Sequence, residues 1–214
     1  DPSRRTWAWD LAELEDLALT ASRIALGGAR LDRLPSEALN VVRVAACLGT
    51  EIDTERLSIA SGLPASEVVE HLNTARREGL IRGRGASTSD STERLLATHG
   101  FVHDRFREAV YESMAPEVRD TIHRDAGRRL VKAAEAEASL LFAGVEQLLQ
   151  ARPVITEPAE RLELAHRLVA AGGLALERAA WAEAARYLES AAVVAPQSLP
   201  PAQEWQLQRR LAIA

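Results

Sequence analysis

Several residue types are nearly missing from this chain of 214 residues. It has one cysteine (Cys47), one lysine (Lys132) and one methionine, and aromatic residues make up 4% of it. A single cysteine excludes an internal disulfide and a zinc site built from several cysteines, and its apolar neighbours predict a small core residue. The sequence shows neither a signal peptide nor an apolar run of the ~20 residues that cross a membrane. We therefore expect a soluble, cytoplasmic protein without membrane contacts.

The motifs of nucleotide-hydrolysing enzymes are missing as well. A phosphate-binding loop has the pattern G-x-x-x-x-G-K-[ST], and the single lysine follows no glycine-rich loop. A serine nucleophile elbow and a glycine-rich dinucleotide turn are also missing. The sequence therefore predicts a chain that is not an enzyme, with no catalytic residue, no metal ligand and no cofactor of its own.

One enzymatic alternative stays open, a metal-dependent phosphohydrolase built around the neighbours His103 and Asp104. Its other ligands would have to come from adjoining helices, where the candidates are His71, Asp120 and Asp125. Nothing in their spacing selects them. His99 cannot share a metal with His103, because four residues along a strand span about 13 Å. His123 lies in a helix rich in alanine and arginine and is expected to be a packing or surface residue.

Apolar residues recur at helical spacing through most of the chain, which predicts a mainly α-helical protein. Three helices are expected first, at residues 36–48, 53–60 and 66–79. Two short strands are expected next, at residues 80–82 and 96–102. Ser36 is the expected N-cap of the first helix, and the Gly/Ser/Thr-rich segment 83–93 is the expected loop between the strands. This order predicts a winged-helix module with a small two-stranded wing.

Helical spacing continues from residue 104 to the end of the chain. The last helix pair, at about 159–178 and 181–194, carries small residues at tetratricopeptide positions: Gly172, Ala184, Leu188, Ala191 and Pro196. These spacings predict an α-helical, tetratricopeptide-like arm. The predicted organisation is a lead-in from an upstream domain (1–34), a winged-helix-like domain (35–103), a helical connector (104–152) and the start of the helical repeats (153–214).

The strand that ends in His103-Asp104 passes directly into an amphipathic helix. Asp104 is the expected N-cap of that helix, where its carboxylate would accept a bond from a free backbone amide. An imidazole N–H at the end of a strand can donate to a phosphate oxygen, and its charge is tunable near neutral pH. The alternative is that His103 simply ends the strand.

Two other groups of residues are candidates for contacts with partners. Trp7 and Trp9 would contact another domain or fold back onto the core of this chain. A winged-helix module also allows DNA binding, for which the candidates are Arg76, Arg77, Arg82 and Arg84. The net charge of −5, with acidic residues in excess around these arginines too, disfavours that alternative and favours a scaffold role.

Several segments together resemble one protein group, the AAA/STAND-type predicted signalling ATPases of bacterial multidomain regulators. The segments are residues 7–11, 31–35, 45–49, 101–105, 122–124 and 179–188. Members of this group are fused to histidine kinases, serine/threonine kinases, nucleotide cyclases or LuxR-type DNA-binding domains. In that group the histidine of a Met-His-Asp type signature senses a bound nucleoside diphosphate, and here Val102 replaces the methionine before His103.

The resemblance implies that this chain is a non-catalytic regulatory fragment, whose winged-helix and helical-repeat regions follow a nucleotide-binding domain. It implies that His103 senses ADP or ATP held by that upstream domain, with Asp104 as the helix-capping neighbour. The implied partners are the upstream domain, a downstream output domain and a protein or small-molecule signal on the helical arm. A DNA-binding winged-helix transcription regulator is the alternative function.

Overall fold

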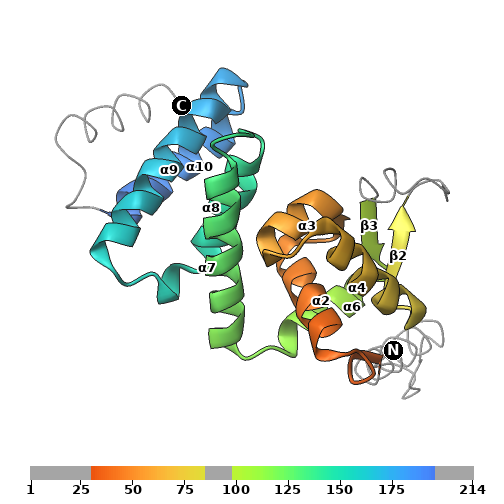
Figure 1. Cartoon of the computed structure of the whole chain (residues 1–214). Helices are drawn as coiled ribbons and strands as arrows, with labels where there is room; N and C mark the ends of the chain where they lie inside the picture. The colour runs from red at the N-terminus through yellow and green to blue at the C-terminus, as the bar shows by residue number, and fades with distance from the viewer. Residues whose placement is uncertain (1–29, 85–97, 196–214) are drawn as a thin grey trace, which may run out of the picture.

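The computed structural model describes residues 30–84 and 98–195. These residues form two groups of helices, one of which carries a small antiparallel sheet (Figure 1). The predicted mainly α-helical fold class is thus confirmed. In the described part of the chain, the helices are too short or too polar to cross a membrane.

The first group holds the sheet and the helices around it. Its helices are α2 (Ser36–Leu48), α3 (Thr54–Ser61), α4 (Ala65–Arg77) and α6 (Asp104–Glu112). Its strands are β1 (Glu51–Asp53), β2 (Ile81–Arg84) and β3 (Thr98–Phe101), in the order β1-β3-β2. The expected ribbon of two strands is therefore a sheet of three, because β1 pairs with β3 through Ile52 opposite His99. A strand of three residues is too short to show an alternating pattern in the sequence.

Helices α2 and α3 differ in how their first turns are capped. The expected N-cap Ser36 is wrong, since Pro35 holds that position with extended backbone and the helix begins at Ser36. Proline at this position makes no side-chain bond to the helix. Asp53 does cap α3, because its Oδ1 accepts a hydrogen bond from the backbone N–H of Arg56 at 2.7 Å.

The first group has a core to which all its elements contribute. Val41 and Val42 of α2, Leu72 of α4 and Ile81 of β2 are buried there, at 1% exposure or less. Phe106 and Val110 of α6 belong to the same core. The predicted domain boundaries stay predictions, but the buried residues of this core continue beyond residue 103 into α6.

The second group consists of long antiparallel helices. They are α7 (Pro116–Ala133), α8 (Leu140–Gln150), α9 (Pro158–Glu177) and α10 (Trp181–Val194), with a 3-10 turn at Arg152–Val154. Helices α7 and α8 cross at Gly127 and Gly144, where an added Cβ on Gly144 would lie 2.8 Å from the backbone N of Val131. Gly172 allows the same close approach of α9 to Leu188 on α10, as the sequence predicts.

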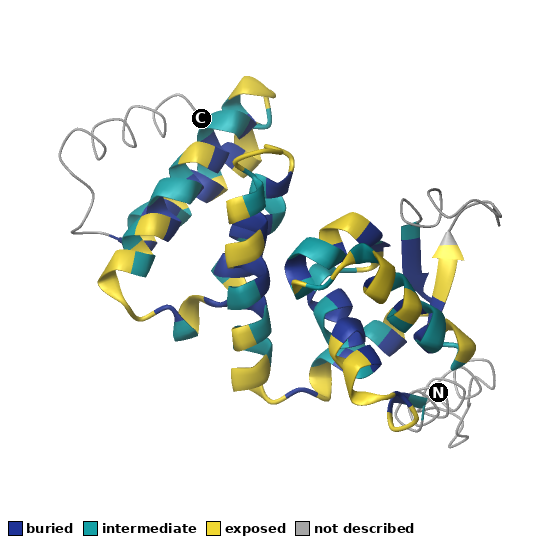
Figure 2. Ribbon diagram, viewed as in Figure 1, coloured by how far each residue is buried: buried dark blue, intermediate teal, exposed yellow. Residues whose placement is uncertain are grey.

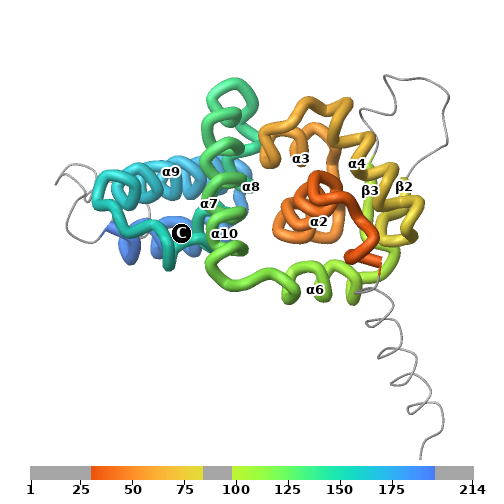
Figure 3. Tube along the Cα trace, turned by 60° about the horizontal axis from the view of Figure 1, so that its bottom comes forward, coloured from red at the N-terminus to blue at the C-terminus, as the bar shows by residue number. Residues whose placement is uncertain are grey.

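Helix α7 belongs to both groups. Ala126 and Leu130 are buried with Ala60 of α3, whereas Val131 is buried with the α8–α10 core. Buried positions on α7 and α8 accordingly face each other and the neighbouring helices (Figure 2). Helix α6 runs along α2 and leads from the sheet toward the start of α7 (Figure 3).

Candidate functional site

His103 lies at the surface, where the sheet passes into α6. Its backbone is extended (φ −141°, ψ 145°), its side chain is exposed, and it holds the N-cap position of α6. Its ring meets the ring of Phe106 edge-on, with the ring centres 5.7 Å apart. Since the imidazole stands on the surface rather than in the core, it is accessible to a partner.

The predicted cap role of Asp104 is wrong. Because His103, which still has an extended backbone, holds the N-cap position, the helix already includes Asp104 as its first residue. Asp104 is instead the first residue of α6, exposed, and the helix has no side-chain cap bond. A carboxylate in the first turn still interacts favourably with the helix dipole, by about 0.3–1 kcal/mol.

Phe106 anchors this end of α6. Its ring is 4% exposed and belongs to the first core. The guanidinium carbon of Arg30 lies 5.7 Å from the ring centre, and Nη1 of Arg30 donates to the carbonyl of Gly79 at 3.1 Å. The first turn of α6 is therefore held by an aromatic side chain with His103 on its edge.

The other end of α6 enters a buried polar network. The Tyr111 hydroxyl lies 3.0 Å from Nε2 of His123, and Nδ1 of His123 lies 2.7 Å from Oε1 of Gln147. Nε2 of Gln147 donates to the carbonyl of Cys47 at 3.2 Å. We call these groups, Tyr111, His123, Gln147 and the Cys47 carbonyl, the buried joint. It connects α6, α7, α8 and α2.

The hydrogen bonds of the buried joint determine which ring nitrogen of His123 carries a proton. Because the Gln147 amide nitrogen donates to Cys47, its oxygen faces His123 and must accept from Nδ1–H. Nε2 of His123 then accepts from the Tyr111 hydroxyl. Burial lowers the pKa of His123, which is 3% exposed, and the hydrogen bond that His123 donates to Gln147 opposes this only in part. The joint thus holds a neutral imidazole.

Cys47 and Tyr111 are kept un-ionised by the same burial. The pKa of the Cys47 thiol is raised to about 12, chiefly by loss of solvent. Burial also raises the pKa of Tyr111. The expectation that Cys47 is a core residue is confirmed, since it is 8% exposed.

Side chains from the later helices bind the carboxyl ends of α2 and α3. The last carbonyls of a helix have no partner within it. In α2, Gln147 binds the Cys47 carbonyl and Nη1 of Arg107 binds that of Ala46 at 3.3 Å. In α3, Nη1 of Arg129 binds the Ala60 carbonyl at 2.9 Å. These bonds attach α6, α7 and α8 to the first group.

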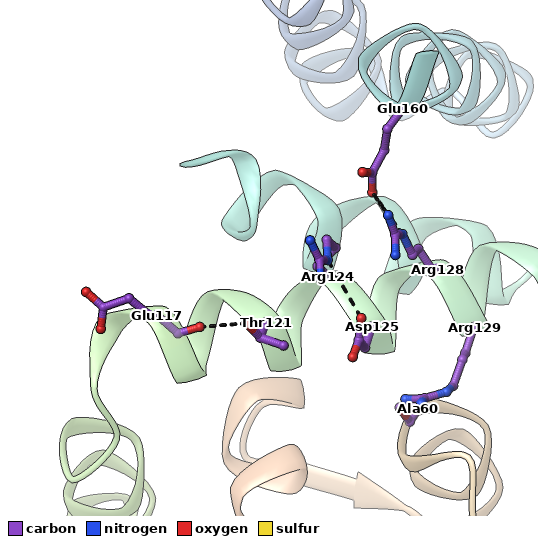
Figure 4. A network of polar contacts seen from close by, with 8 residues as sticks. All are labelled: Ala60, Glu117, Thr121, Arg124, Asp125, Arg128, Arg129 and Glu160. Carbon is purple, nitrogen blue, oxygen red and sulfur yellow. Dashed lines mark hydrogen bonds and ion pairs between the residues drawn. The ribbon is translucent and has the colours of Figure 1, made fainter. Parts of the chain in front are cut away.

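Helix α7 also holds the helical arm. Nε of Arg128 donates to Oε1 of Glu160 on α9 at 2.8 Å. Figure 4 shows Arg128 and Arg129 leaving opposite sides of α7, one toward α9 and the other toward Ala60 of α3. Two adjacent residues of α7 therefore contact the two groups, Arg128 through α9 and Arg129 through α3.

The residues proposed for the metal-dependent alternative do not come together. Among residues 30–84 and 98–195, no three histidine, cysteine or acidic side chains form a group that could hold a metal ion. His71 lies on α4, while Asp120 and Asp125 lie on α7. The phosphohydrolase alternative therefore gains no ligand set from this structure.

A buried histidine in the sheet was not expected from the sequence. His99 is 7% exposed, and neither ring nitrogen has a hydrogen-bond partner within the described residues. Burial lowers its pKa, and the nearby charge of Arg76 adds to the effect. Its cross-strand partner Ile52 lies in the core, which explains the burial.

Of the three DNA-contact candidates whose side chains are described, Arg82 lies apart from Arg76 and Arg77. Arg76 and Arg77 are exposed on α4, and Arg77 donates to Oγ1 of Thr74 at 3.0 Å. Arg82 is exposed on β2, but it alternates with the buried Ile81 and therefore faces away from the side on which α4 packs. The side chain of Arg84 lies outside the described residues, as do Trp7 and Trp9.

Comparison with known proteins identified no relative of this chain. No protein-family model, no curated protein and no solved structure matches the chain.

Proposed function

We propose that this chain is a non-catalytic regulatory region of a multidomain signal-transduction ATPase, in which α6 couples the nucleotide state to the helical arm. The observation that carries the proposal is the position of the two ends of α6. One end presents the exposed imidazole of His103, and the other end, through Tyr111, enters the buried joint.

The geometry of α6 suits a rigid connection. Its nine residues extend about 13 Å at the usual rise of an α-helix. Phe106 and Val110 fix one side of it in the first core, and Arg107 binds the end of α2. A nucleotide phosphate that attracts His103 would pull on the first turn, and the helix would pass that displacement to Tyr111.

The buried joint is sensitive to such a displacement. The bond between Tyr111 and His123 is 3.0 Å long, and a hydrogen bond is lost beyond about 3.5 Å. A shift of roughly 1 Å would break it and leave buried polar groups unpaired. The α7–α8 pair, and the arm attached to it, would then repack into a second arrangement.

The order of elements supports the winged-helix part of the proposal. The first group runs helix, strand, two helices and two strands, with β3 in the centre of the sheet. The close crossing of α9 and α10 at Gly172 supports a repeat-like arm. In this proposal the partners are an upstream domain that binds ADP or ATP, a downstream output domain and a signal on the arm, all in the cytoplasm.

The test uses the longer protein that carries the nucleotide-binding domain. His103→Ala should raise its basal output, because the ADP-bound state, which in this proposal keeps the output low, loses one bond to the nucleotide. His71→Ala is the matched control, since His71 is a partly exposed histidine on another helix of the same group. If both variants signal like the unmodified protein and retain ADP equally, the sensor role of His103 is refuted.

A DNA-binding transcription regulator is the second candidate. Exposed Arg76 and Arg77 on α4 favour it, while Glu67 and Glu70 on the same helix and the separate orientation of Arg82 weigh against it. Fluorescence anisotropy of a labelled duplex at low salt separates the two. Salt-dependent binding that Arg76→Gln weakens would favour the DNA-binding function.

A further inference from the structure

His99 lies on the middle strand of the sheet, with its side chain on the face that packs against the core. Its cross-strand partners are Ile52 on β1 and Gly83 on β2, and residues paired in this way point to the same face of a sheet. Ile52 is 1% exposed and belongs to the first core, so the imidazole is buried beside it. Gly83, on the other side, has no side chain that could bond to the ring.

The surroundings of His99 contain no acceptor for a protonated ring. Both ring nitrogens are buried and lack a hydrogen-bond partner within the described residues. Arg76 of α4 lies close by, since its Nη1 would be 4.0 Å from a Cβ added to Gly83, and its charge acts on the imidazole. The charged group beside His99 is therefore a cation.

Other charged groups of the described residues do not balance this cation. Glu51 and Asp53 are the neighbours of Ile52 along β1, so strand alternation directs them to the opposite face of the sheet. The same holds for Arg82 on β2. Helices α2, α3 and α6 also pack against the sheet, but none of their described side chains carries a charge that changes the pKa of His99. A proton on the ring would thus be buried without a counter-ion.

The ribbon formed by β2 and β3 has a route to open. Strand β2 lies at the edge of the sheet, pairs with β3 and packs on α4 (Figure 1). Gly83 and Arg76 are both exposed, so water lies directly outside the buried ring. An unpaired charge is stable only where water reaches it, and separation of the ribbon from α4 would admit that water.

We propose that His99 is a pH-sensitive switch that controls the packing of the β2–β3 ribbon on α4. While the imidazole is neutral, it stays in the core and the ribbon is closed. When the ring takes up a proton from the solvent, its charge and the repulsion from Arg76 favour an open form in which the ring is hydrated. The switch involves neither His103 nor the buried joint, so it does not depend on the proposed function.

Hydrogen exchange of the β2 and β3 amides in the whole chain tests the switch. It is followed by mass spectrometry at several pH values, with each rate corrected for the intrinsic rate at that pH. Protection should be constant above about pH 6.5, the ordinary pKa of histidine. Below that pH it should fall by up to about tenfold per pH unit, because the open form binds one more proton. His99→Phe keeps a ring in the core and should abolish this fall.

Three further variants separate the switch from a general loss of stability in acid. His123→Gln removes the buried histidine of α7 and should leave the fall in the β2 and β3 amides unchanged. Arg76→Gln should reduce the fall, because the repelling charge is gone, whereas Arg77→Gln, its neighbour in the last turn of α4, should not. The inference is overturned if protection does not fall in the unmodified chain or if the fall persists in His99→Phe. It is also overturned if His123→Gln reduces the fall as much as His99→Phe, or if Arg76→Gln and Arg77→Gln change it equally.

Discussion

Replacement of Gln147 by leucine tests the buried joint directly. The substitution keeps a similar volume but removes the acceptor for His123 Nδ1–H at 2.7 Å and the donor to the Cys47 carbonyl at 3.2 Å. Both partners would be left buried and unpaired, at a cost of about 1–3 kcal/mol each. The greater hydrophobicity of leucine offsets roughly 1 kcal/mol. We expect the free energy of unfolding to fall by about 1–5 kcal/mol.

Urea unfolding followed by circular dichroism measures this loss. With a slope of about 2 kcal/mol per M, the midpoint should move down by roughly 0.5–2.5 M. Gln150→Leu is the matched control, because Gln150 is exposed one turn later on the same helix. Its free energy of unfolding should stay within about 0.5 kcal/mol of that of the unmodified protein. Equal midpoints for Gln147→Leu and Gln150→Leu would refute the assigned role of the joint.

Two further predictions concern pH and packing. The pKa of His123 is lower in the folded than in the unfolded chain, so the unfolded state binds more protons below about pH 6.5. Stability should therefore be full above that pH and decline as the pH falls, by at most about 1.4 kcal/mol per pH unit for each such histidine. His123→Gln should roughly halve this loss of stability between pH 6.5 and 5.5, because the contribution of His99, whose pKa is also lowered, remains. An unchanged loss of stability would contradict the role of His123. Separately, Gly144→Ala should destabilise by about 1–3 kcal/mol, since its Cβ would lie 2.6 Å from Cγ2 of Val131. Gly83→Ala is the control, because its Cβ would meet nothing nearer than 4.0 Å, and equal melting temperatures for the two variants would count against the close crossing.

Helix positions were largely predictable from proline, glycine and apolar spacing. The starts at Pro116 and Pro158 and the ends at Gly49 and Gly62 follow from residues that begin or break helices. The caps at Ser36 and Asp104 were each predicted wrongly, because the preceding residue keeps an extended backbone. Such a one-residue difference depends on the path of the incoming chain, which the local sequence does not contain.

The buried joint could not be predicted from the sequence. Gln147 and Cys47 are 100 residues apart, and only the packing of α8 on α2 brings them together. One signal was present for His123, since it precedes the buried Ala126 and Leu130 by three and seven residues and so lies on the core side of α7. A polar residue at a core position of a helix indicates a buried hydrogen-bond partner, although the sequence does not identify that partner.

In the proposed function, α6 and the buried joint carry the nucleotide state to the arm. Hydrogen exchange of the α9 and α10 amides, in the longer protein with ADP or with ATP bound, tests it most directly. We expect different exchange rates for the two nucleotides in the unmodified protein and equal rates in Gln147→Leu. Equal rates in the unmodified protein, or a difference that persists in Gln147→Leu, would contradict it.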